Sequence, residues 1–312
     1  MKIGFFGTPL HAAKLLKSLY DSDHEISFVV TNIDKPFGRD KKISPSPVKL
    51  FSLEKNLPVL QFESIKSESA IEEILPFEAD IYVVFAYGHI IPEKIFNAPR
   101  LGTINLHGSL LPEYRGASPV QAALADGKKI TGISIQYVTK ELDAGDLILS
   151  REIEIFESDN SETLLVRITE LGIDSLLHLL NTNPSEKFLA TAQDISKVSF
   201  CKKIKAEDRK LNFTESAENL WNKTRAYYPQ YIPYANFRDK RINFHKLRFD
   251  REYKSESLEI GSVHYFDKKT IGIQCGDGHF LILESIQPEN KKVMSVNDFI
   301  NGSKPLEGEK FS

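Results

Sequence analysis

Asn105 and His107 form the most unusual polar pair in the chain, within the run Asn105-Leu-His107-Gly-Ser109. They lie two residues apart at the end of an expected strand, so their side chains point to the same face of a sheet. Asparagine offers an amide donor and histidine exchanges a proton near neutral pH, which suits stabilisation of an oxyanion and protonation of a leaving group. The pattern alone is equally compatible with a structural strand end followed by a proline-containing turn.

Asp143 is the second candidate, in the run Glu141-Leu-Asp143-Ala-Gly145-Asp146 between two expected strands. A loop in this place lies at an edge of the sheet, where an aspartate is able to accept a hydrogen bond from His107. Turns rich in Asp and Gly are common in proteins without any catalytic role. This run is therefore not diagnostic by itself.

Alternating strands and helices must position these residues in the first half of the chain. Strands are expected at residues 2–6, 25–30, 58–60, 80–85, 102–106, 131–138 and 147–155. Helices are expected at residues 8–20, 67–75, 118–125 and 162–180, with another short helix ending near residue 55 and a long polar segment at 31–47. This alternation predicts an α/β, Rossmann-like fold with a mostly parallel sheet covered by helices. Open sheets of this kind bind ligands at the carboxyl ends of their strands.

The pattern changes after residue 180. A helix is expected at residues 214–227, followed by five short strands at 234–238, 241–249, 259–266, 270–275 and 280–286. Short strands separated by turn-like residues predict a small β-barrel of the OB type. We therefore expect a catalytic domain at residues 1–188, a linker at 189–206 and a C-terminal OB-like domain at 207–312.

The composition is that of a globular protein of about two domains. The chain has 312 residues, of which 41% are hydrophobic and 27% are charged, and its formal net charge is −3. No apolar run reaches the roughly 18 residues that span a bilayer, and the first residues match neither a signal nor a transit peptide, so we expect a cytoplasmic protein without a membrane partner. The two cysteines, Cys201 and Cys275, exclude a cysteine-rich zinc site.

The ordered blocks of the sequence resemble formyltransferases that use 10-formyltetrahydrofolate. The blocks are Phe6-Gly7-Thr8-Pro9, Phe85-Ala86-Tyr87-Gly88, Asn105 with His107, Ser109-Leu-Leu-Pro112, Tyr114-Arg115-Gly116-Ala117 and Leu142-Asp143-Ala-Gly-Asp146. They occur in the order and spacing of that family, so the match is far more specific than any single block.

The resemblance implies a role for each matching residue. Asn105 holds the formyl oxygen, His107 assists it and takes part in proton transfer, and Asp143 orients His107 and helps to pass the proton from the attacking amine. The resemblance also implies 10-formyltetrahydrofolate as co-substrate and no metal. The implied folate site has one wall formed by Ser109, Leu110, Leu111 and Pro112, with Tyr87 and Gly88 beside the pterin, largely through backbone groups.

A basic loop bears on the identity of the acceptor amine, because the family formylates methionyl-tRNA, glycinamide ribonucleotide and amino sugars. The segment Lys35–Lys49 carries five basic residues and one acidic residue. It resembles the insertion loop of the family member that acts on tRNA, and Arg39, Lys41 and Lys42 match its basic core. Asp40 stands where that loop usually has a second glycine. A solvated run of charges without a partner is the alternative interpretation.

The second half of the chain is also basic. From Cys201 to Lys254 there are 14 Lys and Arg residues against 7 Asp and Glu residues, although the whole chain is negative. Such a segment suits contact with RNA phosphates, with Lys203 and Lys205 as candidates. The stretch Tyr227–Tyr231 departs from the Pro-Trp-Pro-Gly form that is usual in the family.

The sequence therefore predicts a monomeric enzyme that formylates methionyl-initiator tRNA for translation initiation. Two alternatives stay open. An amino-sugar formyltransferase would share the Asn–His–Asp centre but would have no use for the basic loop. A non-catalytic RNA-binding module would keep the fold but would have no use for the centre.

Overall fold

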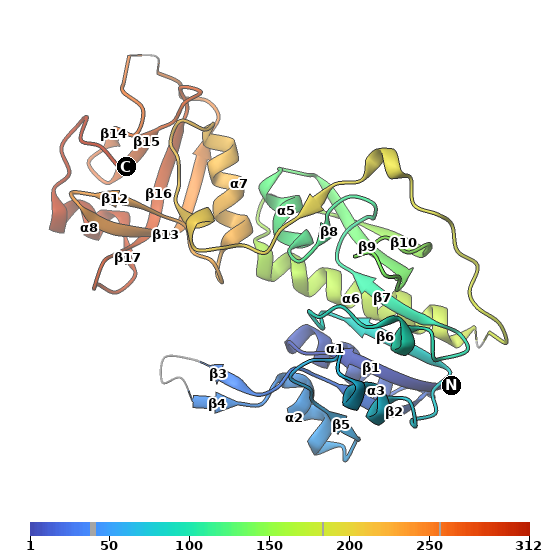
Figure 1. Ribbon diagram of the computed structural model, residues 1–312. Coiled ribbons are helices and arrows are strands. Elements are labelled where there is room, and N and C mark those ends of the chain that lie inside the picture. The colour runs from blue at the N-terminus through green and yellow to red at the C-terminus, as the bar shows by residue number, and fades with distance from the viewer. Residues whose placement is uncertain (38–41, 183, 256) are drawn as a thin grey trace. The chain divides into compact units, whose positions relative to one another are not determined.

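The computed structural model describes residues 1–37, 42–182, 184–255 and 257–312, which divide into two compact units (Figure 1). The N-terminal unit comprises Met1–Pro119, Ile130–Glu154 and Leu165–Cys201. The C-terminal unit comprises Val120–Lys129, Ile155–Leu164 and Lys202–Ser312.

A seven-stranded sheet organises the N-terminal unit, with the order β10-β9-β7-β6-β1-β2-β5. The strands are β1 (Lys2–Gly7), β2 (Glu25–Val30), β5 (Val59–Leu60), β6 (Ile81–Phe85), β7 (Thr103–His107), β9 (Ile130–Tyr137) and β10 (Leu147–Glu154). The five strands from β5 to β7 pair in parallel, whereas β9 and β10 are antiparallel to their neighbours. The expected mostly parallel sheet is therefore confirmed.

The central strands of the sheet are covered on both faces, which explains why their residues are apolar. All five residues of β6 are buried and apolar, as a strand covered on both sides requires. On one face Phe6 packs against Phe28 and Tyr82, with ring centroids 5.8 and 5.4 Å away. These side chains belong to an apolar cluster that also takes in residues of α3 and α4.

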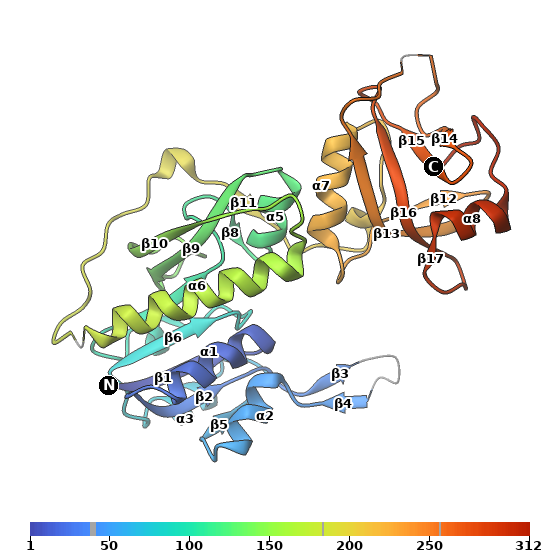
Figure 2. The same ribbon diagram turned by 180° about the vertical axis from the view of Figure 1, so that it is seen from behind.

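Helices follow most of these strands. They are α1 (Leu10–Tyr20), α2 (Pro47–Glu54), α3 (Glu68–Ile74), α4 (Glu93–Phe96), α5 (Pro119–Ala125) and α6 (Ser161–Asn181). Figure 2 shows α6 in front of the sheet, and a Cβ added at Gly172 would lie 2.7 Å from the Leu106 side chain of β7. Helix and strand therefore touch directly at this point. None of the helices in the described chain is long and apolar enough to cross a membrane.

A short hairpin lies within the long polar segment at residues 31–47, where the sequence predicts no strand. β3 (Lys35–Phe37) and β4 (Lys42–Ser44) pair antiparallel, with Lys35 opposite Ser44. Three residues per strand are too few for an alternating pattern to emerge from the sequence, which explains why the hairpin was missed.

The C-terminal unit contains an antiparallel sheet with the order β12-β13-β16-β15-β14, and β17 pairs with β16. Its elements are α7 (Ala217–Tyr227), β12 (Tyr234–Phe237), β13 (Lys240–Asp250), β14 (Val263–Asp267), β15 (Thr270–Gln274), β16 (Phe280–Pro288), β17 (Met294–Ser295) and α8 (Val296–Ser303). The last residues link the two edges, because Phe311 bridges Phe237 of β12 and Lys310 bridges Ser262 beside β14. This closure agrees with the predicted OB-like barrel, although the sequence predicted neither α8 nor the closing segment.

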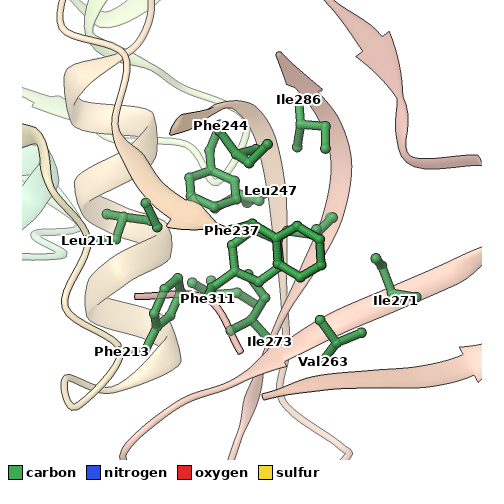
Figure 3. Close-up of a cluster of buried hydrophobic side chains, with 14 of the residues drawn as sticks. Leu211, Phe213, Phe237, Phe244, Leu247, Val263, Ile271, Ile273, Ile286 and Phe311 are labelled. Carbon is green, nitrogen blue, oxygen red and sulfur yellow. The ribbon is translucent and has the colours of Figure 1, made fainter. Parts of the chain in front are cut away.

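Aliphatic and aromatic side chains fill the barrel (Figure 3). Phe237 and Phe311 stack with ring centroids 4.7 Å apart, and Phe244 lies 6.0 Å from Phe311. All three are nearly or fully buried. The closing segment is therefore part of the core of this unit.

Phe244→Ala tests this description of the barrel core. The substitution is expected to lower the free energy of unfolding by about 3–5 kcal/mol, because it removes a buried ring and leaves a cavity. Urea denaturation followed by the fluorescence of Trp221, the single tryptophan, which packs against the barrel core, measures the change. Leu306→Ala is the control, since Leu306 is 68% exposed. Equal denaturation midpoints for the two variants would contradict the assignment.

Candidate active site

The end of β7 carries Asn105 and His107 on one face of the sheet. Asn105 lies opposite Gln136 of β9, and His107 lies opposite Ser134. His107 is 5% exposed and Asn105 is half-buried. Since residues directly opposite each other in a ladder face the same side, β9 lines this face with further polar side chains.

Asp143 reaches the same face from the loop between β9 and β10. Because β9 is antiparallel to β7, this loop begins beside the amino end of β7 and folds back over the sheet, rather than standing off its carboxyl edge. Asp143 has φ 50°, in the left-handed region. Gly145 is required here, because a Cβ on it would lie 1.8 Å from the carbonyl oxygen of Tyr137.

Three donors hold the Asp143 carboxylate. Oδ2 accepts from the backbone N–H of Gly116 at 2.9 Å. Oδ1 accepts from Nε2 of Gln136 at 3.1 Å and from Nδ2 of Asn105 at 3.4 Å. The side chain is 10% exposed, so these donors replace most of its contact with water.

One nitrogen of His107 is committed and the other faces the carboxylate. Nε2 lies 2.9 Å from the carbonyl oxygen of Tyr114, which is only able to accept, so Nε2 carries a hydrogen. Nδ1 lies 3.7 Å from Oδ1 of Asp143, an ion-pair distance longer than a hydrogen bond. Nε2 is therefore bonded to the backbone, and Nδ1 is the ring nitrogen on the side of the Asp143 carboxylate.

The loop after β7 shapes one side of this centre. Ser109 is fully buried, and its hydroxyl donates to the carbonyl oxygen of Glu113 at 2.7 Å. The hydroxyl of Ser134 donates to the carbonyl oxygen of Ser109 at 2.9 Å and accepts from the N–H of Leu111 at 3.0 Å. Leu111 is also buried, whereas Leu110 and Pro112 are half-buried. Ser109 thus braces the loop, which leaves Leu110 and Pro112 as its more accessible residues.

Tyr87 and Gly88 follow β6. The Tyr87 ring is 3% exposed and lies 5.8 Å from the Phe6 ring, and burial raises the pKa of its phenol to about 12. Its carbonyl oxygen accepts from Nδ2 of Asn32 at 3.3 Å. Gly88 is exposed with φ 83°. The side chain of Tyr87 therefore belongs to the core, whereas Gly88 is exposed.

The candidate RNA contacts are described only in part. Arg39 and Lys41 lie outside the described residues, and Lys42 is the first residue of β4. Lys203 and Lys205 are exposed in the C-terminal unit, and Nζ of Lys205 lies 3.6 Å from Glu207.

The sequence predicted no role for several residues that hold the centre together, although Arg115 and Gly116 belong to a recognised block. They are Arg115, Gly116, Ser134, Gln136 and Gln193. A signal existed for Ser134 and Gln136, which are polar residues in an otherwise apolar strand and are 0% and 2% exposed. Gln193 has no comparable signal, because it lies in a segment without periodicity. Within the described chain no group of three or more His, Cys, Asp or Glu residues is placed to hold a metal ion.

Two protein families match the chain. Residues 1–180 match the family described as "Formyl transferase", and residues 203–304 match "Formyl transferase, C-terminal domain". A relative from Leptospira interrogans, named methionyl-tRNA formyltransferase, is 49% identical over 318 residues and covers 100% of both chains. A relative of the same name from Fusobacterium nucleatum is 40% identical and covers 99% of both chains.

Solved structures share the fold at low identity. WlaRD, a sugar 3N-formyl transferase crystallised in the presence of dTDP and 5-N-formyl-THF, has a TM-score of 0.69 at 19% identity, covering 94% of this chain and 99% of its own. HypX from Aquifex aeolicus in complex with tetrahydrofolic acid has a TM-score of 0.63 at 16% identity, covering 96% of this chain and 47% of its own.

Gly145→Ala tests the placement of Asp143. The added methyl group collides with the Tyr137 carbonyl, so the loop must move and carry the carboxylate away from Asn105. A misplacement of about 1 Å at the reacting groups of an enzyme costs about 100-fold in rate. Because the loop is able to absorb part of the shift, we expect the turnover of the variant to fall by about tenfold or more. Gly302→Ala is the control, because a Cβ there meets nothing within 4 Å. Unchanged turnover in a folded Gly145→Ala variant would refute the placement.

Proposed function

Because the chain belongs to the formyl transferase family over both of its matched regions, we propose that it transfers the formyl group of 10-formyltetrahydrofolate to the α-amino group of methionyl-initiator tRNA. The products are formylmethionyl-tRNA, which serves translation initiation, and tetrahydrofolate. The family matches confirm the resemblance to formyltransferases that the ordered sequence blocks indicated. The observation that carries the chemistry is the convergence of Asn105 and His107 on the Asp143 carboxylate.

The reaction begins when the unprotonated amine attacks the formyl carbon. The free pKa of an α-amino group is about 8, so deprotonation is a modest demand. A new C–N bond forms, negative charge collects on the formyl oxygen, and the bond to the folate nitrogen then breaks. The Asn105 amide donates to the oxyanion; its present 3.4 Å bond to Asp143 is long enough to be exchanged for a substrate oxygen.

His107 and Asp143 manage the proton. Nδ1 of His107 faces the reaction side, because Nε2 is occupied by the Tyr114 carbonyl. Asp143 lies next to Nδ1 and stabilises the imidazole when it carries the proton that the amine releases. The proton then passes to the departing folate nitrogen, so the cycle needs neither a covalent intermediate nor a second cofactor.

The folate donor occupies the face beside these residues. The loop of Ser109, Leu110, Leu111 and Pro112 forms one wall, and Tyr87 and Gly88 border the pterin through backbone groups. The burial of the Ser109 hydroxyl and of the Tyr87 ring supports contacts through backbone and apolar atoms rather than through these two side-chain oxygens.

Cationic residues of the basic loop at Lys35–Lys49 and of the C-terminal unit bind the tRNA. Arg39, Lys41 and Lys42 contact the acceptor stem, and Lys203 and Lys205 contact backbone phosphates. We assign residues 1–188 to the catalytic domain, 189–206 to the linker and 207–312 to the tRNA-binding domain. The enzyme acts as a monomer in the cytoplasm.

A formylation assay tests this function directly. It compares charged initiator tRNA, charged elongator tRNA and an amino-sugar nucleotide as acceptors of formyl from 10-formyltetrahydrofolate. We expect product with initiator tRNA at a kcat/KM at least about 100-fold above that of the other two, a discrimination of about 2.7 kcal/mol. The amino sugar is included because WlaRD acts on a sugar. Preference for the amino sugar would overturn the assignment.

Asn105→Ala is expected to lower kcat by about 100-fold or more, as the loss of one oxyanion donor does. The KM values for tRNA and folate should change by less than about threefold, because the amide acts mainly in the transition state. Steady-state kinetics with initiator tRNA measure both quantities. A rise of about 100-fold in KM with an unchanged kcat would assign Asn105 to substrate binding instead.

Joint replacement of Lys203 and Lys205 by Ala is expected to raise the KM for tRNA and to leave the KM for folate unchanged. The slope of log affinity against log salt should fall by about 1 for each lysine that contacts a phosphate. The control is joint replacement of Lys291 and Lys292, which are also exposed in the C-terminal unit. An equal effect of both pairs would mean that only the total charge matters.

A further inference from the structure

A chain of hydrogen bonds joins Arg115 to the Asp143 carboxylate inside the N-terminal unit. Nε and Nη2 of Arg115 donate to Oε1 of Gln193 at 3.1 and 2.7 Å. Nε2 of Gln193 donates to Oε1 of Gln136 at 3.0 Å, and Nε2 of Gln136 donates to Oδ1 of Asp143 at 3.1 Å. Two side-chain amides therefore connect a guanidinium to the carboxylate of the site.

Chemistry fixes the direction of this chain. A guanidinium has donors only, so the oxygen of the Gln193 amide must face Arg115. The nitrogen of Gln193 then faces the other way, where the carbonyl oxygens of Asp143 and Gly145 also accept from it at 3.0 and 2.8 Å. The oxygen of Gln136 must face that nitrogen, which leaves the nitrogen of Gln136 to donate to Asp143.

Burial makes this order consequential. Arg115, Gln136 and Gln193 are 8%, 2% and 9% exposed. Little water is available to replace a hydrogen-bond partner that is lost here, so the loss costs free energy. An amide in the reversed orientation would also place two oxygens against each other. Each amide in the chain is thus held in one orientation by its neighbour.

The segment that contains Gln193 contacts the site at further points. Thr191 bridges Leu147, directly after the Asp143 loop. β11 (Phe200–Cys201) pairs in parallel with β8 (Arg115–Gly116), whose Gly116 N–H holds Asp143. The sequence predicted only a linker of low periodicity here, but residues 191–201 are built into the scaffold of the site.

We propose that Gln193 is a positioning residue for formyl transfer. Because Arg115 only donates, it fixes the orientation of the Gln193 amide, and Gln193 in turn fixes the orientation of the Gln136 amide. The NH₂ group of Gln136 therefore stays directed at the Asp143 carboxylate. Through the two carbonyls Gln193 also fixes the backbone of the Asp143 loop. Gln193 does not touch substrate, and its role in turnover rests on the proposed function of the site.

Gln193→Glu is the most discriminating variant, because it replaces one NH₂ group by an oxygen at nearly constant volume. The new carboxylate still accepts from Arg115, but it offers an acceptor to Gln136, whose amide must turn its oxygen toward Asp143. We expect kcat to fall by about 10- to 100-fold, with KM values within about threefold, because a misplacement of about 1 Å at the reacting groups costs about 100-fold. Gln193→Leu, which removes both halves of the amide, should act similarly.

Lys197→Ala is the matched control from the same segment, since the Lys197 side chain is 71% exposed and pairs only with the nearby Asp194 among the ion pairs described. It should leave kcat unchanged. In an Asp143→Ala background, Gln193→Leu should cost less than about twofold more, because the carboxylate that it positions is gone. General structural damage would instead lower the rate equally in both backgrounds.

The amide exchange rate of Gly116, measured by NMR, gives a readout that does not need turnover. Exchange should accelerate at least about tenfold in Gln193→Glu and stay unchanged in Lys197→Ala, because Gly116 donates to Asp143. Unchanged exchange together with kcat within twofold of wild type would overturn the proposal. If wild type forms no formylmethionyl-tRNA, the proposed function fails, and the exchange rate alone decides whether Gln193 positions Asp143.

Discussion

The nearly buried carboxylate of Asp143 is the constraint on which the rest of the site depends. An ionised carboxylate removed from water is unfavourable unless donors surround it. Here the donors come from β7, β8 and β9, through Asn105, Gly116 and Gln136. The sheet order, the return of the loop after β9 and the pairing of β8 with β11 all bring these donors to one point.

Local backbone strain accompanies this convergence. Ala86, Tyr114 and Asp143 have φ values of 51°, 59° and 50°, although none of them is glycine. Each such residue costs on the order of 1–3 kcal/mol and persists where the surroundings hold it in place. Three of the eight non-glycine residues with positive φ in the described chain therefore lie in the segments that follow β6, β7 and β9. Tyr114 also supplies the carbonyl that fixes His107.

Period-two spacing was enough to place Asn105 and His107 on one face, and the ordered blocks were enough to recognise the family. The strand and helix alternation likewise predicted the sheet and the barrel. Contacts between distant residues were not predictable: Gln193 meets Gln136 across 57 positions, and Phe311 closes the barrel from the last turn of the chain. Tyr87 shows the opposite problem, since a residue inside a recognisable block packs into the core. Local patterns report which face a side chain takes, but not which distant partner meets it.

Single-turnover formylation of methionyl-initiator tRNA by Asp143→Asn tests the central claim most directly. The asparagine keeps the size of the side chain but lacks the negative charge that stabilises a protonated His107. The account predicts a transfer rate lower by about 100-fold or more, with folate affinity within about threefold of wild type. A transfer rate within threefold of wild type would contradict it, because the carboxylate around which the site is built would then have no part in the reaction.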